Sequence, residues 1–399
     1  MDLFNNNAVK LDVLKRRAFN YRWAEVPDGV IPLTAADPDF GVAKEIREAI
    51  IQYTEAGYFS YTPKLGLPEF IEAIHRYLYE TKGEKVNKEC ILPIDSAARG
   101  MYIIAEALLT AGDDAIVFNP VDFLFRKSVE HAGANPILFP ANVVNGKIDL
   151  SQLEAYITGK TKMICLCNPH NPLGLLYEKE DLQLILDLAE KYDLWIMNDE
   201  IWSDIVYPEK PFLSILNVDR TKNDRIFSVY GFSKSFGIAG LRAGCIYCDN
   251  NDFFEKIIEA SCVMETAGGI SSLSQVAGMA CLNESRYWLE AFKKHLTEMR
   301  DYLCERVNLI PGISCRVPEA TYLAYVDVRS FGMTSEAFVN YISKNSNVYL
   351  IPGGEKFFGS NSEGYIRICF ATSQEILKAG LDRLEKGIHM LLSEKQDSK

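Results

Sequence analysis

The stretch "KMICLCNPHNPLGLLYEKEDLQLILDLAEKYDLWIMND", residues 162–199, decides the fold class of this chain. It opens and closes with short apolar runs, 162–167 and 194–199, which are typical of buried strands. The segment between them, 179–193, places apolar side chains at helical spacing, namely Leu182, Ile185, Leu186 and Ala189. A strand, a helix and a second strand in this order predict a parallel sheet covered by helices.

The same alternation continues on both sides of this stretch. We expect further strands at 115–118, 225–231 and 243–248, and further helices at 101–112 and 122–133. A long helix is expected at 285–308, followed by strands at 321–328 and 365–371. The pattern therefore predicts an α/β fold. It has a large domain with a mostly parallel sheet flanked by helices, and a smaller α/β domain.

The expected domain division follows from this order of elements. Residues 46–290 form the large domain, and residues 291–399 form the small C-terminal domain. Residues 1–45 form an N-terminal arm that contributes to the small domain.

The composition excludes several classes of function. The chain has 399 residues, of which 48% are hydrophobic and 24% charged, as in ordinary soluble globular proteins. Its net charge of −12 argues against a nucleic-acid partner. No apolar run is long enough to span a membrane, and the start "MDLFNNNAVK" lacks the layout of a signal peptide. We therefore expect a cytoplasmic protein without a membrane partner.

The cysteines do not indicate a metal site. Of the ten, Cys245 and Cys248 are spaced C-x-x-C, but they lie on an expected strand, where side chains three apart point to opposite faces. No second C-x-x-C completes a zinc site. We interpret both as core thiols and expect no metal.

Polar residues follow several of the expected strands. Asp199 ends one strand, and the loop "NPHNPLG" (168–174) with Asn171 follows another. Lys234 follows a third, in "YGFSKSFGIAGLRAG" (230–244), where small and apolar residues surround it. Because ligands of such sheets bind at the carboxyl ends of the strands, these residues are candidates for one site.

The segment "DSAARG" (95–100) opens a helix near Ala98. Small residues there let the backbone N–H groups of Ala97 and Ala98 approach an anion, and a helix N-terminus favours negative charge. The alternative is an ordinary helix cap by Ser96 or Asp95.

The candidate residues together match one cofactor. A lysine amine forms a Schiff base with an aldehyde, and an anion cradle holds a phosphate. A carboxylate keeps a pyridine nitrogen protonated, so that the ring becomes an electron sink. These properties indicate pyridoxal 5′-phosphate.

From "AADPDF" (35–40) to "YIRICFA" (365–371) the motifs resemble fold-type I pyridoxal-phosphate enzymes of the class I/II aminotransferase group. "SKSFGIAGLRAG" is similar to the lysine signature of that group, which implies that Lys234 binds the cofactor covalently and Arg242 binds its phosphate. The resemblance of "NPHNPLG" implies that Asn171 contacts the ring hydroxyl and lines the substrate site. The resemblance of "DEIW" implies that Asp199 pairs with the pyridine nitrogen.

Two further motifs imply contacts beyond the cofactor ring. "YIRICFA" resembles the segment that carries the arginine for the substrate α-carboxylate, which implies this role for Arg367. "FSYTPKLG" (59–66) resembles the segment whose tyrosine reaches the phosphate of a neighbouring subunit, which implies that Tyr61 does so in a homodimer.

The chain also departs from the pattern of the group. Gly231 replaces a hydroxyl residue three positions before the lysine, so Ser233 is the candidate for that phosphate contact. Trp202 replaces a tyrosine near the ring, and Phe123 is the candidate for stacking on it. Ala36 replaces the glycine whose backbone faces the substrate.

The resemblance leaves two reactions open. Gly237 and Arg242 favour an aminotransferase that moves the amino group of an L-amino acid to a 2-oxo acid in amino acid metabolism. "NPHNPLG" and "EATYLAYVD" (319–327) resemble the cystathionine β-lyase-like branch, so a C–S β-lyase is the alternative. Regulators with this fold form a third class, but the roughly 30 residues before "AADPDF" are too few for an additional DNA-binding domain.

Overall fold

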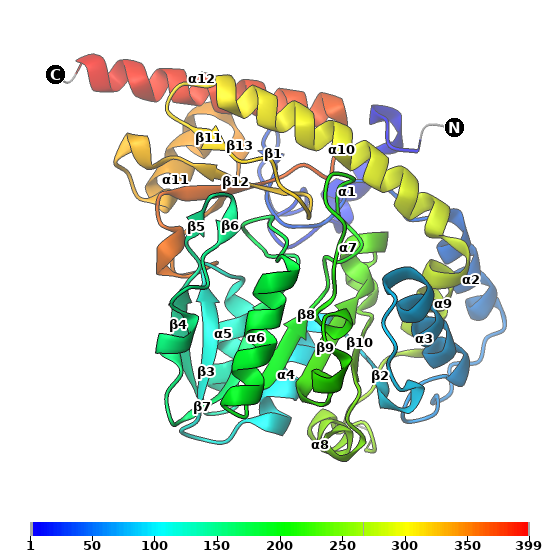
Figure 1. Cartoon of the computed structure of the whole chain (residues 1–399). Helices are drawn as coiled ribbons and strands as arrows, with labels where there is room; N and C mark the ends of the chain where they lie inside the picture. Colours follow the sequence, from blue (N-terminus) through cyan, green and yellow to red (C-terminus); the bar gives the residue numbers. More distant parts are fainter. Residues whose placement is uncertain (1–2, 266, 398–399) are drawn as a thin grey trace. The chain divides into compact units, whose positions relative to one another are not determined.

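The computed structural model describes residues 3–265 and 267–397. The chain divides into two compact units, and Figure 1 follows their elements along the chain. The smaller unit contains 1–41, 171–174 and 290–399, and the larger contains 42–170 and 175–289. The domain boundaries expected from the sequence stay a prediction, because compactness alone does not define an independently folding domain.

The larger unit contains a seven-stranded sheet in the order β2-β10-β9-β8-β7-β3-β4. Strand β10 runs antiparallel to both of its neighbours, and the pairs from β9 to β4 are parallel. The predicted α/β fold with a mostly parallel sheet is therefore confirmed. The strands are β2 (Ile91–Ile94), β3 (Asp114–Asn119), β4 (Asn135–Pro140), β7 (Thr161–Cys167), β8 (Trp195–Asp199), β9 (Ile226–Gly231) and β10 (Gly244–Cys248).

Helices cover both faces of this sheet, with α6 in front of it and α4 behind it in Figure 1. The central strands β3 and β9 are buried along their whole length, as expected of strands covered on both faces. A short hairpin, β5 (Val143–Val144) and β6 (Lys147–Ile148), lies outside the sheet. The helices of the unit are α2 (Lys44–Glu55), α3 (Pro68–Lys82), α4 (Ala97–Leu108), α5 (Phe123–His131), α6 (Lys179–Lys191), α7 (Phe232–Phe236), α8 (Asn251–Ser261) and α9 (Ser272–Glu284).

Helix α4 begins at Ala97, within one residue of the start expected near Ala98 and four residues before the apolar pattern over 101–112. Its N-cap is Ser96, whose side chain accepts a hydrogen bond from the backbone N–H of Arg99 at 3.1 Å. The helix ends at Leu108. The cap proposed for Ser96 is thus present, and it sets the first turn of the helix four residues upstream.

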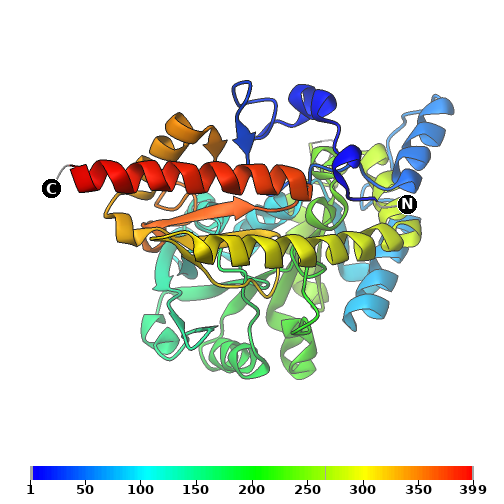
Figure 2. The same ribbon diagram turned by 90° about the horizontal axis from the view of Figure 1, so that it is seen from above.

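The smaller unit is built around a four-stranded antiparallel sheet in the order β11-β12-β15-β14. Figure 2 shows its helices α10 and α12 running side by side, and Arg306 joins them by ion pairs to Asp382 (2.9 Å) and Glu385 (3.0 Å). The elements are α1 (Leu11–Arg17), β1 (Ile31–Pro32), α10 (Arg286–Leu309), β11 (Ser314–Cys315), β12 (Leu323–Asp327), α11 (Ser335–Ser346), β13 (Val348–Tyr349), β14 (Ile351–Pro352), β15 (Tyr365–Cys369) and α12 (Gln374–Asp397).

Across the described residues, none of the helices combines the length and the hydropathy that crossing a membrane requires.

Gly244 allows helix α4 to start close against strand β10. A Cβ atom at this position would lie 2.9 Å from the backbone nitrogen of Ala97 and 2.9 Å from the carbonyl oxygen of Tyr230. Both are backbone atoms of packed elements, so neither can move aside cheaply. A glycine at 244 therefore fixes how closely the first turn of α4 approaches the sheet.

We predict that Gly244→Ala destabilises the protein. The overpacking costs about 1–3 kcal/mol, which outweighs the gain of about 0.5–1 kcal/mol from removing a strand glycine. Denaturant unfolding of the full-length protein measures the difference. Gly159→Ala is the control, because a Cβ there meets no atom within 4 Å. A Gly244→Ala variant as stable as the wild type would contradict this account of the close approach.

Candidate functional site

Lys234 lies on α7, a helix of five residues that begins directly after β9 and ends at Gly237 with a φ of +68°. Its side chain is half-buried, and its Nζ lies 5.5 Å from the centroid of the Trp202 ring. Trp202 itself is buried. The amine thus stands over an aromatic face at the carboxyl end of a central strand.

Asp199 is the last residue of β8, which is the parallel neighbour of β9. Its Oδ1 accepts a hydrogen bond from the backbone N–H of Ile201 at 3.0 Å, and the residue is buried. Burial raises the pKa of this carboxyl to about 7, with smaller contributions from the charges of Asp122 and Glu200. The site therefore favours a cationic partner for Asp199, because such a partner would restore the charged form.

Arg242 and the start of α4 lie together and could hold an anion. Arg242 donates a hydrogen bond from Nη2 to Oγ of Ser96 at 2.8 Å, next to the free backbone N–H groups of the first turn. Arg242 has a φ of +53° and is exposed. Gly244 packs against the backbone of this turn. A guanidinium beside a helix N-terminus suits a phosphate group.

These three features fit pyridoxal phosphate by their chemistry. An amine, a buried carboxyl that favours a cation, and an anion cradle lie at the ends of neighbouring elements in one unit. Lys234 would hold the aldehyde carbon, Asp199 the pyridine nitrogen, and Arg242 with the α4 N-terminus the phosphate.

Asn171 and Arg367 lie in the smaller unit, where they contact each other. Arg367 on β15 donates from Nη1 to Oδ1 of Asn171 at 3.1 Å, and both side chains are buried. The Arg367 guanidinium also lies 4.9 Å from the centroid of the Phe358 ring. The sequence suggested a separate role for each residue, and their hydrogen bond was not foreseen.

Ala36 lies in the same unit as this pair. Its carbonyl oxygen accepts a hydrogen bond from the Tyr322 hydroxyl at 3.2 Å. The remaining candidates lie in the larger unit. Ala97 is buried at the start of α4, and Ala98 and Ser233 are half-buried. Phe123 is the first residue of α5 and is 38% exposed, whereas Tyr61 is 93% exposed.

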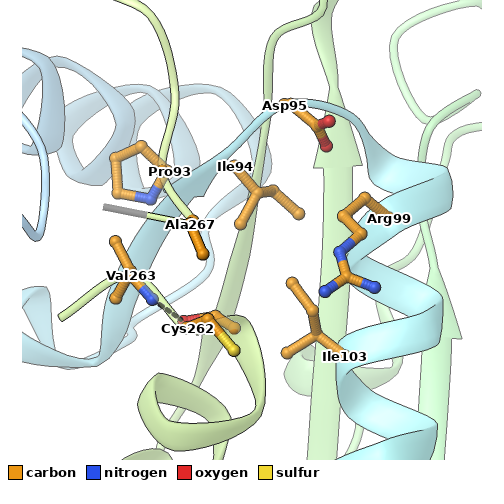
Figure 3. Close-up of a pocket in the computed structure, with 11 residues that line it drawn as sticks. Pro93, Ile94, Asp95, Arg99, Ile103, Cys262, Val263 and Ala267 are labelled. Atoms are coloured by element: carbon orange, nitrogen blue, oxygen red, sulfur yellow. Dashed lines mark hydrogen bonds between the residues drawn. The ribbon is translucent and has the colours of Figure 1, made fainter. Parts of the chain in front are cut away.

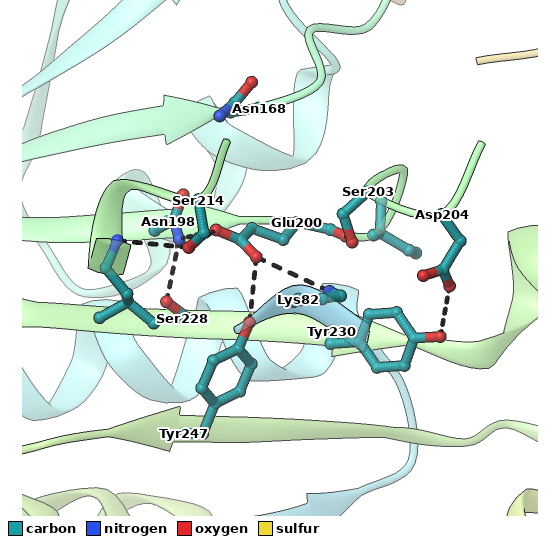
Figure 4. A network of polar contacts seen from close by, with 12 residues as sticks. Lys82, Asn168, Asn198, Glu200, Ser203, Asp204, Ser214, Ser228, Tyr230 and Tyr247 are labelled. Atoms are coloured by element: carbon teal, nitrogen blue, oxygen red, sulfur yellow. Dashed lines mark hydrogen bonds and ion pairs between the residues drawn. The ribbon is translucent and has the colours of Figure 1, made fainter. Parts of the chain in front are cut away.

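Sequence reasoning missed a set of buried polar residues next to Asp199 and Lys234 in the chain, several of which Figure 4 shows. The most prominent are Glu200 and Asp204, two buried carboxylates that hydroxyl groups of other elements contact. The sequence contained a pattern that could have indicated these two carboxylates. Two more acidic residues follow Asp199 within five positions of an apolar strand, where each needs a partner.

A cavity of about 310 Å³ lies beside the start of α4 (Figure 3). Asp95 and Arg99 line one side of it, and the segment around Cys262 lines the other. Lys234 and Asp199 are not among its lining residues. The cavity is therefore not the site that the sequence motifs define.

Comparisons with known proteins agree with the chemistry of this site. Residues 28–384 match the model of the family described as aminotransferase class I and II. A putative aminotransferase, YugH, from Bacillus subtilis (strain 168) is 33% identical over 92% of this chain and 93% of its own length. An aspartate aminotransferase from Pyrococcus horikoshii is 30% identical over 90% of this chain and 91% of its own.

A solved structure is also similar. It is described as a putative PLP-dependent beta-cystathionase from Corynebacterium diphtheriae and superposes with a TM-score of 0.87. It is 27% identical, and the match covers 95% of this chain and 98% of that structure.

The fold and the matched motifs define a pyridoxal-phosphate-dependent enzyme. The chain belongs to the class I and II aminotransferase family. The family and the cofactor predicted from the motifs are both confirmed.

We predict that Asp199→Asn stabilises the cofactor-free protein at pH 8 and not at pH 4. Between about pH 4 and pH 7 the folded wild type binds more protons than the unfolded chain, so its stability falls as the pH rises through this window. The Asn variant has no carboxyl to ionise, so its stability does not fall in this window. At pH 8 its free energy of unfolding should exceed that of the wild type by up to about 4 kcal/mol. Denaturant unfolding at both pH values measures it.

Asp114→Asn is the matched control for this prediction. It also removes a buried carboxylate, but from the start of β3, at the opposite end of the sheet. A gain for Asp199→Asn that is equal at pH 4 and pH 8 would show that ionisation of the carboxyl is not its cause.

Proposed function

We propose that this aminotransferase moves the amino group of an L-amino acid to a 2-oxo acid, with Lys234 as the lysine that carries the cofactor. One observation supports this assignment above the others. Asp199 ends β8, Lys234 follows its parallel neighbour β9, and the Arg242–Ser96 hydrogen bond lies in the same unit.

Each residue has a distinct task in the proposal. When bound, pyridoxal phosphate supplies a sink for the electron pair left at the substrate Cα. The Lys234 amine removes the Cα proton and returns a proton to the reacting atoms. Asp199 holds a proton at the pyridine nitrogen, and Arg242 with Ser96 binds the phosphate.

The pair of Arg367 and Asn171 supports substrate recognition. Arg367 is a buried guanidinium that donates to the neutral amide of Asn171, and a guanidinium presents a planar fork of N–H donors that matches a carboxylate. We propose that Arg367 binds the substrate α-carboxylate in a bidentate manner and that Asn171 orients it. Ala36 would offer its backbone to the substrate, and Phe123 and Trp202 would contact the ring of the cofactor.

A C–S β-lyase is the second candidate. The similarity to the structure described as a putative beta-cystathionase supports it, and so do the segments 168–174 and 319–327, which resemble the lyase branch. Incubation with a panel of amino acids, with and without 2-oxoglutarate, separates the two reactions. An aminotransferase produces 2-oxo acid only with the acceptor, whereas a lyase produces ammonia and sulfide without it.

We predict that Lys234→Ala abolishes turnover while the protein still folds, because no other group replaces the amine. Borohydride reduction of the wild type followed by peptide mapping should label Lys234. Lys256→Ala, an exposed lysine on α8, is the control and should retain full activity. A label on another lysine would contradict the assignment.

We also propose that the enzyme is a homodimer in which Tyr61 reaches the partner subunit's cofactor phosphate. The segment before α3 supports this, since Tyr58, Phe59 and Tyr61 are 80%, 58% and 93% exposed. Met264, whose carbonyl oxygen accepts a hydrogen bond from Lys64 at 2.6 Å, is 49% exposed beside it. Contiguous exposed apolar side chains mark interaction surfaces. The cytoplasmic location stays a prediction.

We predict that Lys234→Ala and Tyr61→Phe chains complement each other after they are dissociated and mixed. If Tyr61 acts across the interface, the mixed dimer holds one intact site and one site with both lesions. Random reassociation then restores about a quarter of wild-type activity, because about half of the dimers are mixed. In the control experiment, the Lys234→Ala chain is mixed with a Tyr58→Phe chain instead of the Tyr61→Phe chain. Activity no higher than that of the Tyr61→Phe parent would place Tyr61 in its own subunit.

A further inference from the structure

A chain of buried polar contacts includes the residues that directly follow Asp199 and Lys234. We call it the anchoring network and define it as Lys82, Glu200, Asp204, Tyr230 and Ser235. All five belong to the larger unit, and their charged or hydroxyl groups are almost fully buried. Figure 4 shows Tyr230 pointing at Asp204, and Glu200 pointing at Lys82.

Asp204 is the centre of one half of the network. Its Oδ2 accepts hydrogen bonds from the Tyr230 hydroxyl at 2.6 Å and from Oγ of Ser235 at 2.5 Å. Its Oδ1 accepts a hydrogen bond from the Tyr77 hydroxyl at 2.8 Å. Hydrogen bonds to a charged acceptor are roughly twice as strong as neutral ones. Asp204 therefore ties together α3, the end of β9 and α7.

Glu200 is the centre of the other half. Its Oε1 accepts hydrogen bonds from Nδ2 of Asn198 at 2.8 Å and from Oγ of Ser214 at 2.7 Å. Its Oε2 lies 3.7 Å from Nζ of Lys82, which in turn lies 4.2 Å from the centroid of the Tyr230 ring. The Tyr230 side chain thus connects the halves, through its ring to Lys82 and through its hydroxyl to Asp204.

Two residues of the network are sequence neighbours of the proposed cofactor-binding residues. Glu200 directly follows Asp199, and Ser235 directly follows Lys234. Asp199 and Lys234, which we assign to the pyridine nitrogen and the aldehyde carbon of the cofactor, are therefore each next to a residue held by the network. Two adjacent side chains point in different directions, so one can face the site while the other is held behind it.

The tyrosines remain donors at working pH. Burial, and then the charge of Asp204, raise the pKa of both Tyr77 and Tyr230 well above the ordinary value for a phenol. Both hydroxyls consequently keep their protons and keep donating to the carboxylate.

We propose that Asp204 positions Lys234. Asp204 holds α7 against β9 through its hydrogen bonds with Ser235 and Tyr230. The proposal rests on the proposed function, because it takes Lys234 as the lysine that carries the cofactor. Asp204 touches neither cofactor nor substrate in this proposal. It restricts where the lysine amine stands, since α7 has only five residues and cannot hold its own position by helix formation.

Hydrogen–deuterium exchange of the full-length protein tests the proposal. In Asp204→Asn the charged acceptor is lost, so we expect amide exchange of the peptide covering α7 to rise about tenfold. Asp114→Asn, which removes another buried carboxylate at the start of β3, should leave that peptide unchanged. If Asp204→Asn does not fold, Ser235→Ala serves, because it keeps the carboxylate and removes only the link to α7.

A second measurement separates positioning from general stability. The visible circular dichroism of the bound cofactor reports the orientation of its ring, and we expect its amplitude to fall in Asp204→Asn and in Ser235→Ala but not in Asp114→Asn. Folded variants with wild-type exchange at α7 and wild-type dichroism would overturn the proposal. Borohydride reduction and peptide mapping of the same samples separately test the proposed function, in which Lys234 carries the cofactor. A label on a lysine other than Lys234 refutes the proposed function, while the exchange result still decides whether Asp204 holds α7.

Discussion

The close approach of helix α4 to strands β9 and β10 is the constraint on which the larger unit depends. Gly244 and Gly231 carry no side chain where the first turn of α4 meets the sheet, and a Cβ at Gly231 would lie 3.3 Å from that of Ala97. The free N–H groups of that turn consequently come to the same edge as the ends of β8 and β9. Ser96 then caps the helix and accepts a hydrogen bond from Arg242, so one residue serves the fold and the anion cradle.

The three carboxylates at and after the end of β8, Asp199, Glu200 and Asp204, have different environments and different roles. Asp199 accepts one hydrogen bond, from a backbone N–H, and burial raises its pKa. Both properties are expected of a carboxyl that binds a cationic ligand. Glu200 and Asp204 have several side-chain donors each, which suits groups that hold structure. Burying a carboxylate without partners is expensive, so the number of donors around each one indicates what it is for.

Much of the site could be predicted because its residues follow strands. The apolar runs identified β7, β8 and β9, and the polar residues after them, Asp199 and Lys234, were candidates for that reason alone. Family resemblance added Arg367 and Tyr61, which no local pattern identifies. The start of α4 was predicted to within one residue by "DSAARG", whereas the apolar pattern over 101–112 begins four residues after it, because helical periodicity does not locate a cap. The hydrogen bond between Asn171 and Arg367 could not be predicted, since the two residues lie 196 positions apart.

The sequence by itself determined the α/β fold class, the family and the cofactor, because each depends on short-range patterns: apolar runs, glycines and polar residues at strand ends. Only the tertiary structure decided which buried charges support which functional residue. The anchoring network joins Lys82, Glu200, Tyr230 and Ser235 from separate elements, and their local sequence does not show which of them contact one another. Their partners are set by strand order and helix packing, which bring distant segments within hydrogen-bonding distance only once the chain has folded.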